Sequence, residues 1–201
     1  MKKILFLMLL IVITIVTTGV YRLTQQADIC YYKGRDLFVK AKYKDSIPFF
    51  RESLVHDPKR PETLSKLGYA YLWSGNYPKA IEVFQTLISS EPKATRVKKS
   101  LANVYSWNKE YAKAEAIFLE VLQTDPNDRD AQKELAEIYI WDNKFDLSKA
   151  ILTALLQNNP GDARAKLLYG KALLYSGHTK EAIRIFEELS KVPKPTAKEN
   201  L

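Results

Sequence analysis

The chain has 201 residues, of which 46% are hydrophobic and 27% are charged, and its formal net charge is +8. This composition excludes intrinsic disorder, and the length suits one domain with a short appendage. Cys30 is the only cysteine, so no intramolecular disulfide can form, and we expect it to be a small buried residue.

The N-terminal segment, residues 1–22, is apolar after a short basic start. Lys2 and Lys3 precede an apolar run from Ile4 to Tyr21, which is close to the minimum length for spanning a bilayer. Two interpretations remain open: an uncleaved transmembrane anchor that ends at an interfacial tyrosine, or a signal peptide cleaved near residues 17–19. The length of the run favours the anchor.

Both interpretations give the same topology. The two lysines and the amino terminus carry more positive charge than Arg22 at the other end of the run, so the N-terminus is expected to stay in the cytoplasm. We therefore expect a single-pass protein of a bacterial inner membrane with residues 23–201 in the periplasm. If the signal is cleaved, these residues would be secreted to the periplasm.

Residues 61–94 form a unit that recurs along the rest of the chain. Prolines recur every 34 residues, a tyrosine series and a tryptophan series keep the same period, and all three series share one register: Pro58, Pro92, Pro126 and Pro160; Tyr71, Tyr105 and Tyr139; Trp73, Trp107 and Trp141. Within the unit, small and apolar residues follow a helix–turn–helix spacing, and this pattern resembles the tetratricopeptide repeat (TPR).

The resemblance implies an all-α fold, a TPR α-solenoid of five helix–turn–helix repeats. The predicted organisation is a signal or anchor over 1–22, repeats over 27–60, 61–94, 95–128, 129–162 and 163–196, and a tail over 197–201. Positions within each repeat are counted from 1 to 34 below. The small residues at position 8 are expected to let the paired helices approach closely, and the aromatic residue at position 24 is expected to fill the space between them.

The individual repeats differ at a few points. The first has Lys33 and an internal Pro48, and the absence of Pro and Gly between Gly19 and Gly34 predicts one helix that runs from the N-terminal segment into this repeat. The turn residue at position 15 is Gly75 in the second repeat, and it becomes Lys109, Asn143 and Gly177 in the following ones.

In the TPR family, the first helix of each repeat lines a concave groove through positions 2, 5, 9, 12 and 13. The candidate partner-binding residues that the resemblance implies here are Tyr69, Trp73, Arg96, Lys99, Asn103, Trp107, Lys133, Trp141, Arg164, Lys171 and Tyr175. Basic residues outnumber acidic ones at the groove positions, which favours an acidic partner.

An aromatic residue at position 13 recurs in four successive repeats and suggests a ladder along the groove. Its rings could stack on sugars or on peptide side chains. Alternatively, they could fold against neighbouring helices and hold the repeats together. Rings turned into solvent would favour a glycan, and rings tucked under the next repeat would favour a protein partner bound elsewhere. Tyr-x-Trp repeats also occur in exported bacterial TPR proteins similar to polysaccharide-secretion subunits.

Lys99 and Asn103 match two positions of the carboxylate clamp by which some TPR proteins hold a peptide C-terminus. The match ends at Glu134 and Leu168, where an asparagine and a basic residue are expected. At the C-terminal end, Ile183 and Phe186 are expected to form an exposed apolar face, because too few residues follow for a capping helix. That face is predicted to bind a partner or to form a homodimer.

No catalytic, metal-binding or cofactor-binding pattern is present. His56 and His178 stand alone at turns, without a second ligand at metal-binding spacing. We expect a non-catalytic TPR adaptor that binds protein partners in an envelope-associated assembly, without cofactors and without nucleic acid. The alternative is a carbohydrate-binding scaffold for an exported polysaccharide or peptidoglycan.

Overall fold

The computed structural model describes residues 2–92 and 94–191, with the backbone alone at residues 2–7, 9, 20, 23 and 24. In these ranges the chain is all-α. The ten helices there are α1 (Lys2–Val39), α2 (Tyr43–His56), α3 (Pro61–Trp73), α4 (Tyr77–Ser90), α5 (Thr95–Trp107), α6 (Tyr111–Thr124), α7 (Arg129–Trp141), α8 (Phe145–Asn158), α9 (Ala163–Tyr175) and α10 (Thr179–Lys191). Residues 192–196 of the fifth predicted repeat and the tail 197–201 lie outside the described residues.

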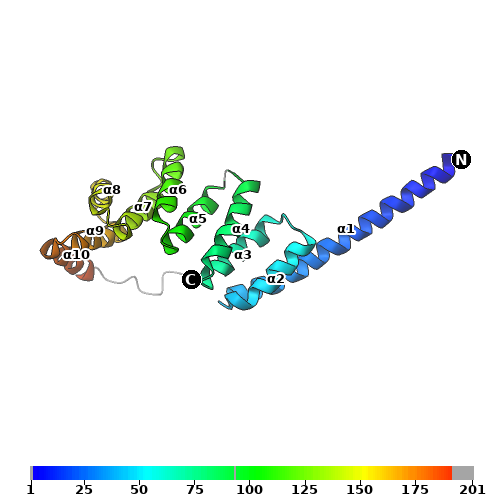
Figure 1. Cartoon of the computed structure of the whole chain (residues 1–201), viewed down its shortest axis with the longest axis horizontal. Coiled ribbons are helices and arrows are strands. Elements are labelled where there is room, and N and C mark those ends of the chain that lie inside the picture. Colours follow the sequence, from blue (N-terminus) through cyan, green and yellow to red (C-terminus); the bar gives the residue numbers. More distant parts are fainter. Residues whose placement is uncertain (1, 93, 192–201) are drawn as a thin grey trace. The chain divides into compact units, whose positions relative to one another are not determined.

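The helices form hairpins, in which an odd-numbered A helix is followed by an even-numbered B helix, as expected for the TPR fold (Figure 1). They belong to two compact units, one up to Val97 and one from Lys98, and each unit is considered separately. In the second unit, α7 packs against both α6 and α8, and α9 packs against both α8 and α10. These A helices therefore contact the B helix before them as well as the one after them.

The turn inside each hairpin has the same geometry in every repeat. Position 15 has a positive φ of 57° at Ala41, 80° at Gly75, 62° at Lys109, 59° at Asn143 and 88° at Gly177. The N–H of position 16 donates to the carbonyl of position 11, as from Asn76 to Tyr71 over 2.9 Å, which closes a Schellman motif. The residue with positive φ ends the A helix, so position 13 is the last helical residue and lies directly beside the turn.

Close approach of the paired helices depends on position 8. A Cβ atom added at Gly68 would lie 2.7 Å from the ring of Phe84, and one added at Gly34 would lie 2.8 Å from the ring of Phe50. Both phenylalanines are completely buried. The prediction that small residues at position 8 make room for the aromatic residue at position 24 is therefore confirmed in these two repeats.

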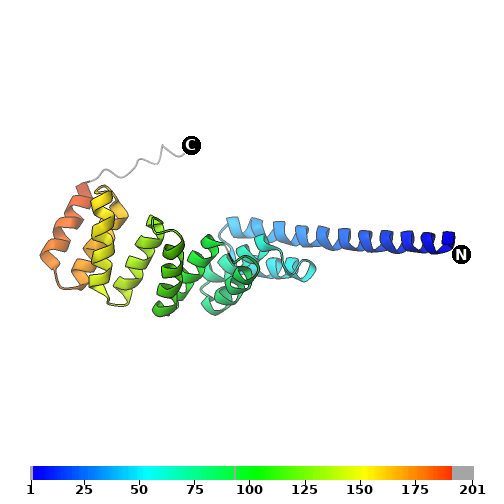
Figure 2. The same ribbon diagram turned by 90° about the horizontal axis from the view of Figure 1, so that it is seen from above.

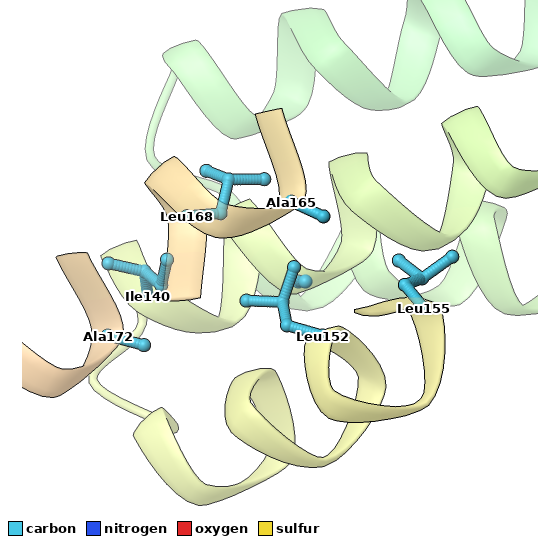
Figure 3. Packing of buried hydrophobic residues seen from close by; sticks show 7 residues of the cluster. Ile140, Leu152, Leu155, Ala165, Leu168 and Ala172 are labelled. Atoms are coloured by element: carbon cyan, nitrogen blue, oxygen red, sulfur yellow. The ribbon is translucent and has the colours of Figure 1, made fainter. Parts of the chain in front are cut away.

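The core of the second unit lies between three helices (Figure 3). Ile140 of α7 and Leu152 of α8 point toward Leu168 and Ala172 of α9, and all four are at most 3% exposed. In the first unit, Phe38 and Phe50 pack with Leu67 and Ala70 of the next A helix. In both units a buried cluster thus joins one repeat to the next, as expected for a repeat protein.

α1 is a single helix of 38 residues, as the absence of Pro and Gly predicts. Its C-terminal part lies beside α2, and its N-terminal part extends past the end of α2 in both views (Figures 1 and 2). Apolar side chains on that part, among them Ile11, Val12 and Val16, are about half exposed. Among the described residues, no helix meets the length and hydropathy needed to cross a membrane.

Candidate partner-binding surface

The aromatic residues at position 13 occupy the last residue of four A helices, next to the hairpin turn. They remain partly accessible, with exposed fractions of 49% for Trp73, 44% for Trp107, 39% for Trp141 and 60% for Tyr175. They are therefore neither buried in the core nor fully free in solvent. Each of these rings leaves part of its surface available for contact with a partner.

Trp73 shows how such a ring is held. Its centroid lies 5.2 Å from the ring of Phe38 and 5.0 Å from that of Tyr43, both in the preceding repeat. Tyr69, another predicted groove residue, stacks on Trp73 at 5.4 Å and meets Phe84 edge to face. Trp73 thus holds two repeats together and keeps half of its surface exposed. The sequence suggested either a ring that packs on neighbouring helices or a ring that is open to a ligand, and Trp73 combines both features.

A hollow of about 310 Å³ lies beside Trp73, over the turn between α1 and α2. Lys42, Lys44 and Asp45 line it together with Tyr43, and all three charged side chains are exposed. Two lysines against one aspartate beside an aromatic ring give a weakly basic surface, which suits an extended ligand with negative groups.

The basic residues predicted for the groove of the second unit are engaged in ion pairs within the chain. The Nζ of Lys99 lies 2.7 Å from a carboxylate oxygen of Asp128, and the Nζ of Lys133 lies 3.1 Å from Asp162. All four side chains are at most 27% exposed. Lys99 is thus already paired at one of the two positions that match a carboxylate clamp.

The same holds closer to the C-terminus. Arg164 contacts Glu134 at 2.7 Å and Glu137 at 3.2 Å, and Lys171 lies 3.9 Å from Glu137. Asp128 and Asp162 lie outside the groove positions of the repeat, so counting charges at those positions missed two acidic side chains. The charge of this surface in the second unit is largely compensated, and the excess of basic residues seen in the sequence gives little preference for an acidic partner.

The two aspartates also cap helices. Asp128 accepts a hydrogen bond from the N–H of Ala131, and Asp162 accepts one from the N–H of Ala165, each over 2.9 Å. The bond from Ala165 lowers the pKa of Asp162, burial opposes this, and Lys133 adds to the lowering. Burial acts to raise the pKa of Asp128, but bonds from Lys99 and Ala131 outweigh it and the pKa is lowered. Both aspartates therefore stabilise the fold, as helix caps and as partners of lysines.

The remaining predicted groove residues take different places. Asn103 is half-buried on α5, and Arg96 is exposed in the first turn of that helix. In the second unit, Trp107 and Trp141 end successive A helices, and Tyr175 ends the next one.

The predicted apolar face on α10 needs a correction. Ile183 is 50% exposed, as expected. Phe186, in contrast, is partly buried, because its ring packs on Gly170 of α9. A Cβ atom at Gly170 would lie 2.5 Å from that ring. Phe186 is therefore first a core residue of its own hairpin, and only its outer part belongs to the surface.

Sequence reasoning missed an apolar hollow of about 500 Å³ in the second unit. It lies between α6, the start of α7 and α8, and Leu119, Leu122, Leu147 and Ile151 line it. Leu119 and Leu147 are 43% and 50% exposed. Their apolar character at positions 25 and 19, which are polar or charged in most other repeats, was the signal in the sequence.

The described residues hold no group of three potential metal-ligating side chains. Cys30 is buried and lies within 4.0 Å of the amide nitrogen of Gln26. The surface described above consists of partly exposed aromatic rings, compensated charges and two hollows.

Comparison with known proteins agrees with this architecture. A model of the tetratricopeptide repeat family matches residues 40–104, 108–158 and 142–194. No curated protein matches the chain.

Among solved structures, the chain is similar to MamA, with a TM-score of 0.68 and 22% identity over 82% of this chain and 90% of that one. A MamA structure from Desulfovibrio magneticus RS-1 gives 0.71 and 18% over 82% and 93%. YrrB, described as a TPR protein with an unusual peptide-binding site, gives 0.63 and 15% over 86% and 89%. At these identities the likeness shows the fold alone.

Proposed function

Since the chain belongs to the tetratricopeptide repeat family, a family of protein-binding scaffolds, we propose that it is a non-catalytic adaptor that holds a protein partner in an envelope-associated assembly. The observation that carries the proposal is the partly exposed aromatic residue at the end of four A helices. An aromatic ring that is already fixed by neighbours loses little conformational entropy on binding.

The chemistry of the surface favours an extended peptide with apolar or aromatic side chains. In the second unit the cations of the A helices are paired, so aromatic contacts would provide most of the binding energy there. The similar structure of YrrB is described as having a peptide-binding site, and a peptide ligand is the corresponding proposal for this chain.

We further propose that residues 4–21 anchor the adaptor in a bacterial inner membrane, with the repeats in the periplasm. The support is the apolar run after Lys2 and Lys3, together with exposed apolar side chains on the part of α1 that extends past α2. In water such a helix would leave a large apolar surface uncovered, whereas a bilayer would cover it.

Replacing Trp107 tests the proposed binding surface. Trp107→Ala should weaken partner binding by about 1–3 kcal/mol while changing the melting temperature little, because the ring ends its helix and is 44% exposed. The measurement is crosslinking of partners in intact cells, followed by titration of the purified pair. Val55→Ala is the control, since Val55 is 69% exposed but lies on the B helix α2, away from the ends of the A helices.

A large loss of stability with unchanged binding would contradict the proposal, because it would make Trp107 a structural residue. Equal loss of binding in both variants would also contradict it, since the aromatic edge of the A helices would then have no special role.

A second function, a scaffold that binds an exported polysaccharide or peptidoglycan, is favoured by the hollow beside Trp73. Its partly exposed indole and two exposed lysines suit a sugar chain with acidic groups. Co-sedimentation with purified peptidoglycan sacculi would test it directly. Retention of the wild-type protein and release of Trp73→Ala would support the glycan and replace the peptide proposal.

A further inference from the structure

The first repeat differs from the later ones at the position where an A helix meets the repeat before it. At position 10 the A helices after the first carry Ala70, Val104, Ile138 and Ala172, all at most 2% exposed. In the two clusters described above, Ala70 and Ala172 pack on the repeat before them. The first repeat has Asp36 at this position, paired with Lys40 at 2.8 Å in solvent. The first repeat thus has a charged pair at this position, while Ile29 and Tyr32 on the same helix are 47% and 51% exposed.

The last B helix, α10, exposes an apolar residue. Position 21 of a B helix faces the next repeat, since Glu115 on α6 contacts Tyr139 and Lys144 at 3.0 and 2.8 Å. On α10 this position is Ile183, and it is 50% exposed. At position 24 Phe50, Phe84 and Phe118 are completely buried, whereas Phe186 is not. Within the described residues, nothing covers this side of α10.

The exposed side of α10 has a heptad-like pattern. Thr179, Ile183, Phe186 and Ser190 follow at spacings of four, three and four residues and so share one face. Lys180 and Glu187 are seven residues apart, flank this face and carry opposite charges. This pattern is self-complementary in one orientation only.

We propose that α10 pairs with α10 of a second copy of this chain in an antiparallel, two-fold symmetric dimer. With Ile183 opposite Phe186 of the second copy, Lys180 of each helix faces Glu187 of the other, so two ion pairs form on the flank. In a parallel pairing the flank with Lys180 and Glu187 would face the opposite flank of the second helix, where Ala182 stands, and these ion pairs would not form.

Charge reversal tests this dimer with the full chain in detergent by sedimentation equilibrium. Glu187→Lys should raise the dimer dissociation constant by roughly tenfold, because two attractions become two repulsions. Lys180→Glu should do the same, and the double reversal Lys180→Glu/Glu187→Lys should restore dimerisation. Glu181→Lys makes the same change on the other side of α10 and should leave the dimer intact.

Ile183→Glu should abolish the dimer with unchanged helicity by circular dichroism. These changes leave α1 untouched, so association through that helix would persist in all variants. A wild-type chain that is monomeric at roughly 100 μM, a dimer indifferent to all α10 variants, or a double reversal that fails to restore association would overturn the proposal. The result is independent of which ligand the A helices bind.

Discussion

Ser106 is a buried polar residue whose side chain is left without a partner. It is 3% exposed on α5, and its Oγ has no hydrogen-bond partner in the part of the chain that the structure describes. At the same position of other repeats stand Leu72 and Ile140, which are buried apolar residues. A hydroxyl in such a place loses its hydration without compensation.

Ser106→Ala should therefore raise the free energy of unfolding by about 1 kcal/mol, since the uncompensated hydroxyl disappears and alanine favours the helix. Urea unfolding measures the change. Ser148→Ala is the control, because Ser148 is equally buried but its Oγ donates to the carbonyl of Ala136 over 2.9 Å. Stabilisation by the control and not by Ser106→Ala would contradict this reasoning.

Asp162 links stability to pH. Its pKa is lower in the folded chain, so its carboxylate contributes stability above its unfolded pKa, and this contribution is lost as the pH falls through the lower folded value. Asp162→Asn keeps a capping side chain but removes the charge facing Lys133. We expect a loss of about 1 kcal/mol at neutral pH, and little difference from wild type once the aspartate is protonated.

The check on Asp162 is a pair of urea titrations, one at neutral and one at acidic pH. Asp130→Asn is a useful comparison, because Asp130 also reaches Lys133 at 3.4 Å but is 74% exposed. If both variants lose equal stability, the less exposed pair of Asp162 and Lys133 contributes no more to stability than the exposed one.

At the scale of the hairpin, positions 8 and 24 behave as one steric unit. Gly68 lies under Phe84, whereas the fourth repeat combines Ala136 with Leu152, and these four residues line the buried interior of their hairpins. In the fourth repeat the added methyl group and the smaller side chain compensate each other in volume, whereas the third repeat accommodates Ala102 together with Phe118, both completely buried. Such exchange is typical of a close-packed core.

Gly68→Ala should destabilise the chain by about 1–2 kcal/mol, because the clash with Phe84 outweighs the gain in helix propensity. Adding Phe84→Leu should recover stability, so that the double variant is better than the sum of the two single changes predicts. Thermal and urea unfolding of all three variants give the coupling energy. Strict additivity would show that the two positions do not share one space.

The hairpins could be predicted from the sequence because their signals repeat. The prolines, the tyrosines and the small residues at position 8 all keep one period, and the small residues act within a hairpin while the prolines lie in the loops between hairpins. The pairing of Lys99 with Asp128, and of Lys133 with Asp162, could not be predicted in this way. Each pair joins residues 29 apart, and its contact depends on how one helix packs on the next.

Local rules failed at two other points for related reasons. Ala41 adopts a positive φ of 57°, although alanine gives no signal for it, because the Schellman turn of the repeat requires this conformation. Phe186 was predicted to lie at an exposed apolar face, but Gly170 of its own hairpin leaves room for its ring.

At the scale of the whole molecule, the open question is where the repeats lie. The positive residues precede the apolar run, so a reporter enzyme that is active only outside the cytoplasm should work when fused after Leu201. Mass spectrometry of the mature N-terminus would show whether the run is cleaved. A cytoplasm-active reporter that functions at this position would contradict the proposed topology.

Because α1 is unbroken, it fixes the rotation of the first repeat about the helix axis relative to the N-terminal apolar run. Each residue of an α-helix advances the chain by about 100° and about 1.5 Å. Since α1 runs from Lys2 to Val39 and its last part is the A helix of the first repeat, one residue inserted near Arg22 would turn that repeat by this angle about the helix axis. Seven inserted residues would return it nearly to its original direction, displaced by about 10 Å. The number of residues between the apolar run and the first repeat therefore sets the direction in which the first repeat faces.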